Sequence, residues 1–317
     1  MPSYCYFQKK IVPLSEAKLG AMTNSMHYGT SIFEGIRGNW NEKNQQIYIF
    51  RLKEHYERLL QGCRVLRCDL PYTVEDMCRI TLEMVRKCDF KEDIYIRPLA
   101  YRSSEALGVR LYDLDSDLLI FAMPWGPYLK CDKARCSVSS WRRPEDNVIP
   151  PSVKVAGIYV NNALAKTEAV LNGYDEAIML TPDGHVSEGS GENIFLVIDG
   201  KLVTPSTNSS ILNGITRRTV IQMAQEEMGI TTEERFVDRS ELYTCSECFL
   251  TGTAAHLTPV AEVDNRKVGD GEIGPITAKL QKLYFDVIRG NNKRYAGWST
   301  PVYEKKPRAT AKAGRKA

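Results

Sequence analysis

A sharp break after residue 123 constrains the fold of this chain more than any other feature. Two prolines and a glycine fall within 124–128 (PWGPY), directly after a strand-like run at 117–123. Proline cannot continue a β ladder, and Pro–Gly clusters mark turns and linkers. The length of 317 residues also suits about two domains. We therefore predict two domains, at 1–123 and 136–304, joined by a linker at 124–135 that closes over a cleft.

Both halves mix the two kinds of hydrophobic periodicity, which predicts an α/β (α+β) fold. Apolar residues recur at helical spacing in several segments and alternate, as in strands, in others. The expected helices cover 53–65, 73–88, 160–171, 215–228 and 276–288. The expected strands cover 4–12, 45–50, 93–101, 117–123, 134–141, 176–180, 193–198, 201–204, 248–252 and 257–263. Residues 21–38 are rich in small, aromatic and charged groups, which favours a site-forming strand and turn.

The net charge of +3 comes from the last thirteen residues. The segment 305–317 (KKPRATAKAGRKA) has six basic residues and no acid, so the rest of the chain is net negative. A basic, alanine-rich segment after a proline is typical of a disordered tail. Such a tail could contact nucleic acid nonspecifically, but the sequence offers no matching basic face, so we expect no specific nucleic-acid partner.

The cysteines indicate a reducing compartment. Nine are scattered along the chain, an odd number without the spacing of a secreted disulfide framework. Cys245 and Cys248 form the only close pair, which we interpret as two core residues, with redox sensing left open. A zinc site would need a second such pair.

With no run of eighteen apolar residues and no apolar leader at the N-terminus, we expect a cytoplasmic protein with no membrane partner.

One lysine and one glutamate in the second half carry the chemistry. Lys154 lies among Val153, Val155 and Ala156, so we expect its amine to be partly desolvated, with a lowered pKa. Such an amine can form an imine with a carbonyl. Glu188 lies in the turn 187–193 (SEGSGEN) and could keep a pyridine nitrogen protonated. Together these are the two groups that pyridoxal 5'-phosphate requires from a protein.

A phosphate-binding site is also predicted. Residues 212–217 (LNGITR) open a helix, whose free backbone amides and dipole favour an anion. The small hydroxyl-bearing turn 251–254 (TGTA) could donate further hydrogen bonds, and Arg58 could add a charged one. A second glycine pattern, 269–274 (GDGEIG), matches a dinucleotide fingerprint. Its two acids would repel a pyrophosphate and no βαβ unit follows, so we discount it.

Taken together, eight stretches in one order resemble the branched-chain amino acid aminotransferases of the fold type IV pyridoxal phosphate enzymes. They are HYGTSIFEGIR (27–37), EHYERL (54–59), YIRPL (95–99), WGPY (125–128), KVAGIY (154–159), SEGSGENIF (187–195), LNGITR (212–217) and TGTAAHLTPV (251–260). The likeness covers about residues 4–300. It implies a PLP-dependent, ping-pong transamination of leucine, isoleucine and valine with 2-oxoglutarate, at a site where the two domains meet.

The resemblance also assigns roles to single residues. Lys154 would bind the cofactor covalently and then move the proton at Cα, Tyr159 would hydrogen-bond the phenolic oxygen of the ring, and Glu188 would pair with the pyridinium. The phosphate would be held by Arg58, Ile215, Thr216 and Thr253. The substrate would be bound by Tyr28, Phe33, Gly35, Arg37, Tyr95, Arg97, Trp125, Tyr128, Thr253 and Ala254. No metal is implied.

The assigned substrate pocket has two characters. Its walls are mainly apolar, while Arg97 with Tyr28 and Tyr128 would receive the side-chain carboxylate of glutamate; Tyr95 and the backbone at 253–254 would take the α-carboxylate. The family is at least dimeric, with residues near the N-terminal domain reaching the neighbour's site, so a homodimer or higher oligomer is implied.

Two features depart from the family and two alternatives stay open. His256 stands where an acid is expected in the turn 251–260, which leaves the substrate range open. The 245–248 cysteine pair precedes the Thr253 turn, whereas the redox pair of mammalian relatives follows it. Within fold type IV the alternatives are a D-amino acid or amine aminotransferase or an aminodeoxychorismate lyase, which the Tyr95-x-Arg97 pair argues against. Outside it, the alternative is a non-catalytic protein acting through the basic tail.

Overall fold

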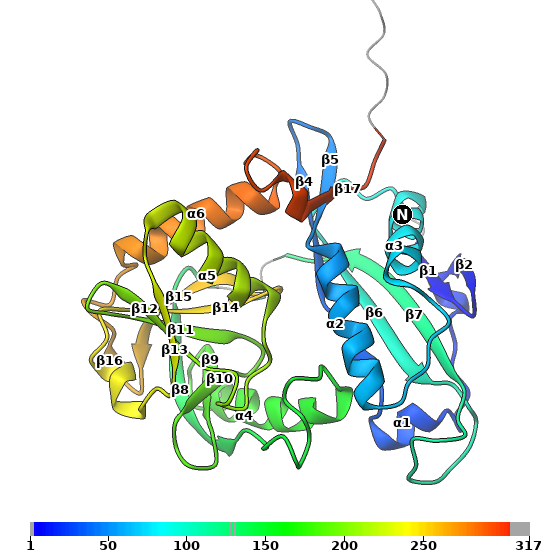
Figure 1. The fold of residues 1–317 in the computed structure, drawn as a ribbon, viewed down its shortest axis with the longest axis horizontal. Helices are drawn as coiled ribbons and strands as arrows, with labels where there is room; N and C mark the ends of the chain where they lie inside the picture. Colours follow the sequence, from blue (N-terminus) through cyan, green and yellow to red (C-terminus); the bar gives the residue numbers. More distant parts are fainter. Residues whose placement is uncertain (1–2, 127, 130, 305–317) are drawn as a thin grey trace, which may run out of the picture.

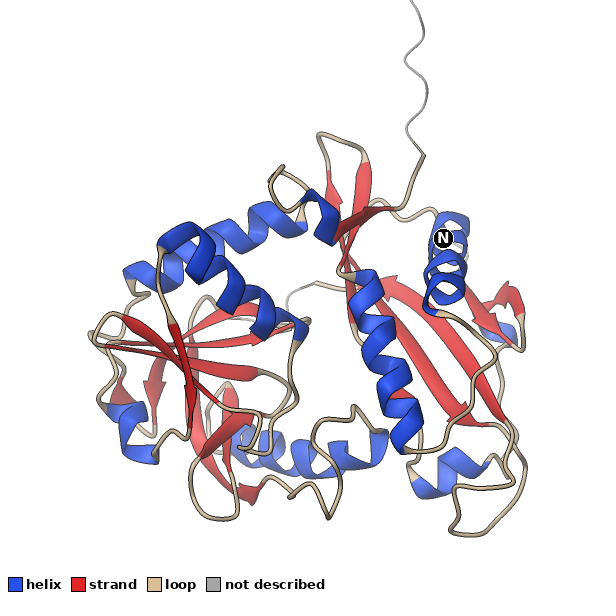
Figure 2. Cartoon of the chain, viewed as in Figure 1, coloured by secondary structure: helices blue, strands red, loops and turns tan. Residues whose placement is uncertain are grey.

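Two β-sheets, one from each half of the chain, form the framework (Figures 1 and 2). They are seen in a computed structural model that describes residues 3–126, 128–129 and 131–304. The predicted tail at 305–317 and Pro127 of the predicted linker lie outside the described residues. The strand order is β17-β5-β4-β6-β7-β1-β2 in the first sheet, with β3 paired to β6. In the second it is β10-β9-β8-β15-β14-β11-β12-β13, with β16 paired to β15.

The elements of the first half are mostly antiparallel strands with two long helices. They are β1 (Tyr4–Phe7), β2 (Lys10–Pro13), η1 (Leu14–Glu16), α1 (Asn24–Tyr28), β3 (Ile32–Phe33), β4 (Ile36–Asn41), β5 (Gln46–Phe50), α2 (Leu52–Val65), α3 (Val74–Cys88), β6 (Ile94–Arg102) and β7 (Ser116–Pro124).

The second half contains the mixed sheet and three long helices. Its elements are β8 (Ala134–Arg142), η2 (Ala156–Ile158), α4 (Tyr159–Leu171), β9 (Glu176–Leu180), β10 (Val186–Gly189), β11 (Asn193–Ile198), β12 (Lys201–Pro205), α5 (Ile215–Met228), β13 (Thr232–Arg235), η3 (Arg239–Tyr243), β14 (Glu247–Gly252), β15 (His256–Val263), β16 (Arg266–Lys267), α6 (Pro275–Ile288), η4 (Ala296–Trp298) and β17 (Ser299–Pro301).

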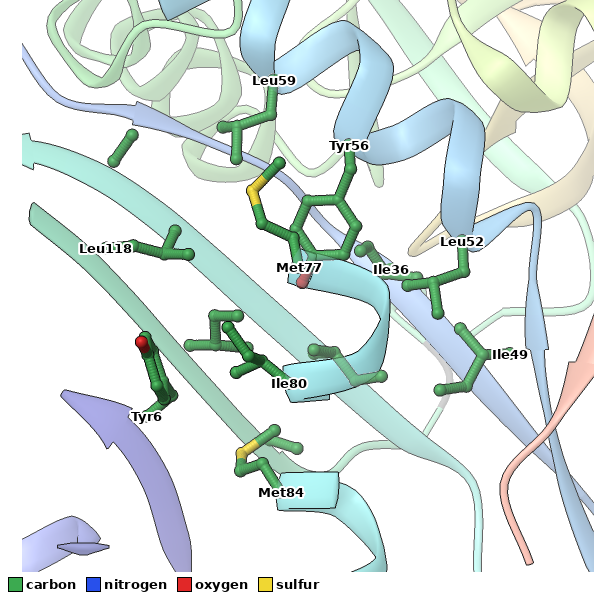
Figure 3. Packing of buried hydrophobic residues seen from close by; sticks show 14 of the residues in the cluster. Tyr6, Ile36, Ile49, Leu52, Tyr56, Leu59, Met77, Ile80, Met84 and Leu118 are labelled. Atoms are coloured by element: carbon green, nitrogen blue, oxygen red, sulfur yellow. The ribbon is translucent and has the colours of Figure 1, made fainter. Parts of the chain in front are cut away.

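The helices pack the apolar faces that their sequences present. Buried residues of α2 and α3 meet strand residues in one core, which Figure 3 shows from close by. The labelled members of that core are Tyr6, Ile36, Ile49, Leu52, Tyr56, Leu59, Met77, Ile80, Met84 and Leu118. Helix α3 begins with a capping box in which the Thr73 hydroxyl accepts from the Asp76 amide and the Asp76 carboxylate accepts from the Thr73 amide. Thr73 is therefore the N-cap of the helix predicted at 73–88.

The sequence prediction differs from the structure at two places near the N-terminus. Residues 4–12 form a hairpin of β1 and β2, not one strand, because Gln8 and Lys9 adopt positive φ in the turn. Asn and Gly are the usual residues at such positions, so no turn pattern marks this hairpin in the sequence. Residues 21–38 begin with the short helix α1, which ends at Gly29 in the left-handed region with φ of 64°.

The end of the described chain returns to the first sheet. After α6, strand β17 pairs with β5, so Ser299 lies opposite Phe50 and Pro301 opposite Tyr48. In Figure 1 the segment from α6 to β17 runs from the second half back to the strands of the first. The two-domain division stays a prediction, and strand β17 would belong to the first unit and not to 136–304.

Candidate active site

One cavity of about 430 Å³ brings together residues of both halves. It is lined by all but two of the residues that the sequence assigned to the site. The lining residues among them are Phe33, Gly35, Arg58, Tyr95, Arg97, Trp125, Tyr128, Lys154, Tyr159, Glu188, Ile215, Thr216, Thr253 and Ala254. The predicted placement of a cleft between the two halves is therefore seen in the cavity lining.

The segment that carries Lys154 is anchored to the first sheet. The Phe33 amide donates to the Lys154 carbonyl at 3.0 Å, and Val155 bridges to Ile32. The Lys154 ammonium donates to the Tyr159 hydroxyl at 2.6 Å and lies 5.1 Å from the centre of the Phe33 ring. Because Tyr159 opens α4, the helix start fixes the hydroxyl beside the amine.

The pKa of Lys154 moves against the sequence-based expectation. Burial does lower it, as expected, but the neighbouring Tyr159 and Glu34 favour the ammonium and leave the pKa raised overall. The lowered pKa expected from the apolar neighbours in the sequence is wrong, because those neighbours do not report the groups that the fold brings close.

Glu188 lies in the same cavity and is held on both oxygens. The Arg143 guanidinium lies 2.9 Å from one carboxylate oxygen, and both groups are almost fully buried. The other oxygen accepts from the Asn193 side-chain amide at 3.0 Å and from the Leu212 backbone amide at 3.1 Å. Burial raises the pKa of Glu188, and Arg143 opposes that shift. The charge is thus fixed in place with its position set by three donors.

Helix α5 opens into the cavity without a side-chain cap. Its N-cap Gly214 makes no side-chain hydrogen bond, and Ile215 and Thr216 of its first turn line the cavity. A Cβ on Gly214 would lie 2.1 Å from the Asn193 side-chain oxygen, so the close approach requires glycine. The buried Thr251 hydroxyl, also in the lining, has no hydrogen-bond partner among residues 3–126, 128–129 and 131–304. These free donors suit an anion.

Helix α6 shows the opposite arrangement, at the glycine pattern that the sequence analysis set aside. Its first turn is already capped by Glu247, whose carboxylate accepts from the Ile276 amide at 3.1 Å and from the Thr277 amide at 2.8 Å. A carboxylate occupies the place a phosphate would take, which supports discounting residues 269–274 as a dinucleotide site.

Arg58 is tied to a buried acid that the sequence analysis did not identify. Its guanidinium forms two bonds to Glu34, at 2.7 and 2.8 Å, and a third of 3.3 Å to the Asn213 carbonyl just before α5. Glu34 is fully buried and also lies 2.7 Å from His55. Burial raises the pKa of Glu34, but Arg58 and His55 outweigh that effect and hold it well below its usual range. The pairing positions Arg58 at the mouth of α5.

The opposite end of the cavity is mainly apolar. Arg97 stacks over Phe33, with 4.4 Å from the guanidinium carbon to the ring centre, and donates to the Tyr95 hydroxyl at 2.9 Å. Tyr95 in turn packs against Trp125, with ring centres 4.7 Å apart. The buried Nε of Arg97 has no hydrogen-bond partner in the part of the chain that the structure describes. This end therefore offers a stacked cation with spare donors.

Two predicted site residues lie outside the lining. The Tyr28 hydroxyl accepts from the Gly108 amide at 2.8 Å, away from the cavity. Arg37 lies behind the wall, where it donates to the carbonyls of Trp125 and Gly126 and, at 3.4 Å, to that of Ala254. Buried arginines commonly donate to backbone carbonyls. The sequence alone therefore could not show whether Arg37 lines the cavity or supports the residues that do.

Several lining residues were given no role by the sequence analysis. They are Leu99, Arg143, Pro151, Val153, Ala156, Ile158, Asn162, Gly191, Glu192, Asn193 and Leu212. Thr251 and Gly252, which also line the cavity, belong to the turn 251–254 that was expected to donate hydrogen bonds. Arg143 follows directly on an exposed arginine, Arg142, and only the fold decides which of the two turns inward. Lys166 of α4 pairs with the buried Glu176 at 2.6 Å, and its ammonium lies 5.4 Å from the ring centre of Tyr128 in the lining.

The departures noted in the sequence lie away from the cavity lining. His256 has φ of 58° and packs against Tyr284 and Phe285 of α6. Burial, with Arg37 and Arg289 nearby, lowers its pKa to about 3. Cys245 and Cys248 are free and buried in the core of the second half.

Within the described ranges no cluster of metal-ligating side chains occurs, and no helix there is both long and apolar enough to cross a membrane.

Comparisons with known proteins agree with this geometry. The model of the class IV amino-transferase family matches residues 31–263. A probable branched-chain-amino-acid aminotransferase of Aquifex aeolicus is 55% identical over 95% of this chain and 97% of its own. The branched-chain aminotransferase of Thermoproteus uzoniensis, solved with norvaline, is 43% identical and superposes with a TM-score of 0.91 over 96% of this chain and 99% of its own.

A third match bears on the cofactor. The branched-chain amino acid aminotransferase of T.th., solved with N-(5'-phosphopyridoxyl)-L-glutamate, is 40% identical, with a TM-score of 0.90 over 95% of this chain and 99% of its own. The mixed α/β fold expected from the sequence is confirmed by these structural matches. With its family model matched over more than half its length, the chain belongs to the class IV aminotransferases.

Proposed function

We propose that this chain is a pyridoxal phosphate-dependent branched-chain amino acid aminotransferase that uses 2-oxoglutarate as amino acceptor in a ping-pong reaction. The observation that carries the proposal is the single cavity in which Lys154, the Glu188–Arg143 pair and the uncapped start of α5 converge. An amine, a fixed carboxylate and an anion-binding helix end match the carbonyl, ring nitrogen and phosphate of the cofactor.

The residues fit that cofactor from one end to the other. Ile215 and Thr216 at the helix start, with Arg58 and Thr253, would hold the phosphate. Glu188 would hold the ring nitrogen, and Tyr159 the phenolic oxygen. When bound, the cofactor supplies an electron-withdrawing ring that stabilises negative charge at the substrate Cα.

Lys154 would move the proton at Cα. The amine must be neutral to accept a proton, whereas Tyr159 and Glu34 favour its charged form. Lys154 would hold the cofactor at its carbonyl carbon, a role that also requires the neutral form of the amine. The Tyr159 hydroxyl, 2.6 Å away, would keep the nitrogen aimed at the reacting carbon.

The substrate end suits two kinds of side chain in turn. Phe33, Trp125 and the aliphatic lining can receive leucine, isoleucine or valine, for which each methylene contributes roughly 1–3 kcal/mol of discrimination. The guanidinium of Arg97, which has a free Nε and stacks on Phe33, can pair with the side-chain carboxylate of glutamate. The T.th. relative solved with a phosphopyridoxyl-glutamate supports glutamate as the second substrate.

Lys154→Ala tests the proposal directly. We expect the purified protein to be yellow and to convert L-leucine to its 2-oxo acid in single turnover without acceptor, with 2-oxoglutarate restoring the starting spectrum. Lys154→Ala should lose at least about 10²–10⁴-fold in rate, since it removes the acid–base group. Lys201→Ala, at an exposed ion pair with Glu233, is the matched control and should leave the rate unchanged.

Assays with a panel of amino donors distinguish the proposed function from the alternative functions. Activity with D-alanine but none with L-leucine would replace this proposal by a D-amino acid aminotransferase. A colourless protein whose salt-dependent nucleic-acid binding is lost on removal of residues 305–317 would replace it by the non-catalytic alternative.

Assembly and location belong to the same proposal. Tyr28 lies outside the cavity of its own chain, so a homodimer in which it reaches the neighbour's site would account for the role assigned to it. Size measurement by light scattering, with Tyr28→Phe kinetics, tests this. A cytoplasmic location, supported by nine free cysteines, would be tested by cell fractionation.

A further inference from the structure

Two cysteines meet at the C-terminal end of α2. The helix ends in a Schellman motif: the Cys68 amide donates to the Cys63 carbonyl at 2.8 Å, the Arg67 amide donates to the Arg64 carbonyl at 3.3 Å, and Arg67 is left-handed with φ of 52°. This motif brings the side chains of its first and last residues into contact. Here both residues are cysteines, each 3% exposed and both free.

A buried cation without a carboxylate partner stands beside this pair. Arg102 is 2% exposed, and its guanidinium donates to the Ser116 hydroxyl at 2.7 Å, the Leu111 carbonyl at 3.1 Å and the Leu66 carbonyl. Its Nε has no hydrogen-bond partner, and it forms no salt bridge within the described ranges. An unpaired buried charge is costly, so an anion nearby would be stabilised.

Cys68 is the group placed to supply that anion. The neighbouring Cys63 thiol, with Ser116 and the Arg102 guanidinium, lowers the pKa of Cys68 against the effect of burial. The pKa values of the other eight cysteines are all raised, chiefly by burial or, at Cys63, by the contact with Cys68 itself. One thiolate-forming cysteine next to a second thiol is the arrangement of a redox-active pair.

We propose that Cys63 and Cys68 form a redox-active dithiol, in which Cys68 is the reactive thiolate and a peroxide converts the pair to a disulfide that ties the end of α2. The Cys68 thiolate attacks one oxygen of the peroxide, the O–O bond breaks, and hydroxide leaves as the sulfur becomes a sulfenic acid. The Cys63 sulfur then attacks the Cys68 sulfur, the S–O bond breaks, and the Cys63 proton leaves with the hydroxyl as water. The sulfurs lose two electrons, and the peroxide is reduced to one water and one hydroxide, which becomes a second water by taking up the proton that Cys68 released on ionising.

The end of α2 is accessible to an oxidant, and a disulfide there would lie close to the cavity wall. Arg64, Val65 and Arg67 around the pair are exposed, so fraying of the last helical turn uncovers the thiols. Gly62, next to Cys63, packs so closely against the segment before Lys154 that a Cβ there would lie 3.1 Å from Val153. The pair therefore lies one residue from the contact between α2 and the cavity wall.

The experiment uses the intact, cofactor-loaded protein. After brief exposure to a small excess of hydrogen peroxide at pH 7, free thiols are blocked with N-ethylmaleimide and the digest is examined by mass spectrometry. We expect peptides joined through Cys63 and Cys68, two hydrogens lighter than the reduced pair and separated again by dithiothreitol. Oxidation at this pair should be at least about tenfold faster than at Cys78, whose pKa is raised.

Single variants identify the attacking sulfur. In Cys63→Ser, dimedone should trap a sulfenic acid at Cys68, while Cys68→Ser should give none at Cys63; Cys245→Ser is the control and should leave the 63–68 bond unchanged. Failure of the wild-type protein to form this bond, or its formation only in urea, would overturn the proposal whether or not the variants fold. Trapping at Cys63 instead would overturn the assignment of the thiolate.

Discussion

The two ends of the cavity treat charge differently. At the end built from the second half, Glu188 has a guanidinium and two amide donors within 3.1 Å. At the end built from the first sheet, Arg97 rests on an aromatic face and keeps a buried nitrogen without a partner. A saturated network holds one chemical group in one position, whereas a stacked cation with spare donors can accept a carboxylate or tolerate an apolar neighbour. The difference indicates that the Glu188 end holds one group in a fixed position, whereas the Arg97 end can discriminate between substrates.

The largest expected effect comes from breaking the saturated end. Glu188→Gln removes the charge that pairs with Arg143 and leaves a buried guanidinium uncompensated, at a cost of about 3–5 kcal/mol in the free energy of unfolding. It should also lower kcat by about 10²–10³-fold, the size found when one preorganised electrostatic group is removed. Urea unfolding and steady-state kinetics measure the two losses.

A matched glutamate separates burial from charge. Glu262→Gln breaks an ion pair with Arg135, whose side chain is 49% exposed, and should leave both the free energy of unfolding and the kinetics close to those of the wild type. Equal effects of the two substitutions would show that the network around Glu188 is not special.

The sequence predicted these two ends unequally. Lys154, Glu188 and the start of α5 stand in local patterns whose chemistry is readable residue by residue, and the cavity lining contains all of them. Their partners Arg143 and Glu34 were not identified, because a buried charge is recognisable only once strands distant in sequence place its counter-charge beside it.

Local patterns also predicted most helices and strands, but not the long-range contacts that hold them together. The periodicity of α2 through α6 follows from neighbouring residues alone. The inward position of Arg37 behind the wall and the return of β17 to the first sheet depend on contacts over more than eighty residues. No local propensity encodes such contacts.

The second prediction breaks the adaptable end. Arg97→Gln removes the cation but keeps hydrogen-bonding capacity, so kcat/KM for glutamate should fall about 100-fold, which corresponds to the roughly 1.5–3 kcal/mol of a hydrogen bond to a charged group. For leucine the change should stay within about threefold. Arg142→Gln, at an exposed position beside the cavity residue Arg143, is the control. A parallel loss for both substrates would mean that Arg97 supports the fold and does not select substrates.

The third prediction sharpens the role of close packing at the same end. A Cβ on Gly35 would lie 2.2 Å from the Tyr95 hydroxyl and 2.9 Å from its ring, so Gly35→Ala must displace Tyr95 and, through it, Arg97. We expect about 1–3 kcal/mol of overpacking cost and a higher KM for amino acids. Gly297→Ala, where a Cβ meets nothing within 4 Å, should change neither quantity. An unchanged KM in Gly35→Ala would show that Tyr95 has room to move.

The last prediction tests an exception at the saturated end. Glu192 is buried in the cavity lining, yet among the described residues its carboxylate accepts a hydrogen bond only from the Gly191 amide, at 3.1 Å. Burial and then the neighbouring Glu176 raise its pKa, with Glu188 adding to the shift and Lys166 opposing it. In the folded protein this carboxyl therefore keeps its proton at pH values where the unfolded chain has lost it.

The sign of the pH dependence follows from that raised pKa. Above the ordinary pKa of about 4.3 for glutamate, the unfolded state binds fewer protons than the folded state, so the free energy of unfolding falls as pH rises, until the pH passes the raised pKa. Relative to Glu192→Gln, the wild type should lose at most about 1.4 kcal/mol per pH unit between pH 5 and 8. Urea unfolding of both cofactor-loaded proteins across that range measures the difference. A difference that does not change with pH would mean that Glu192 is ionised and compensated like Glu188, and that every carboxylate at this end of the cavity is paired.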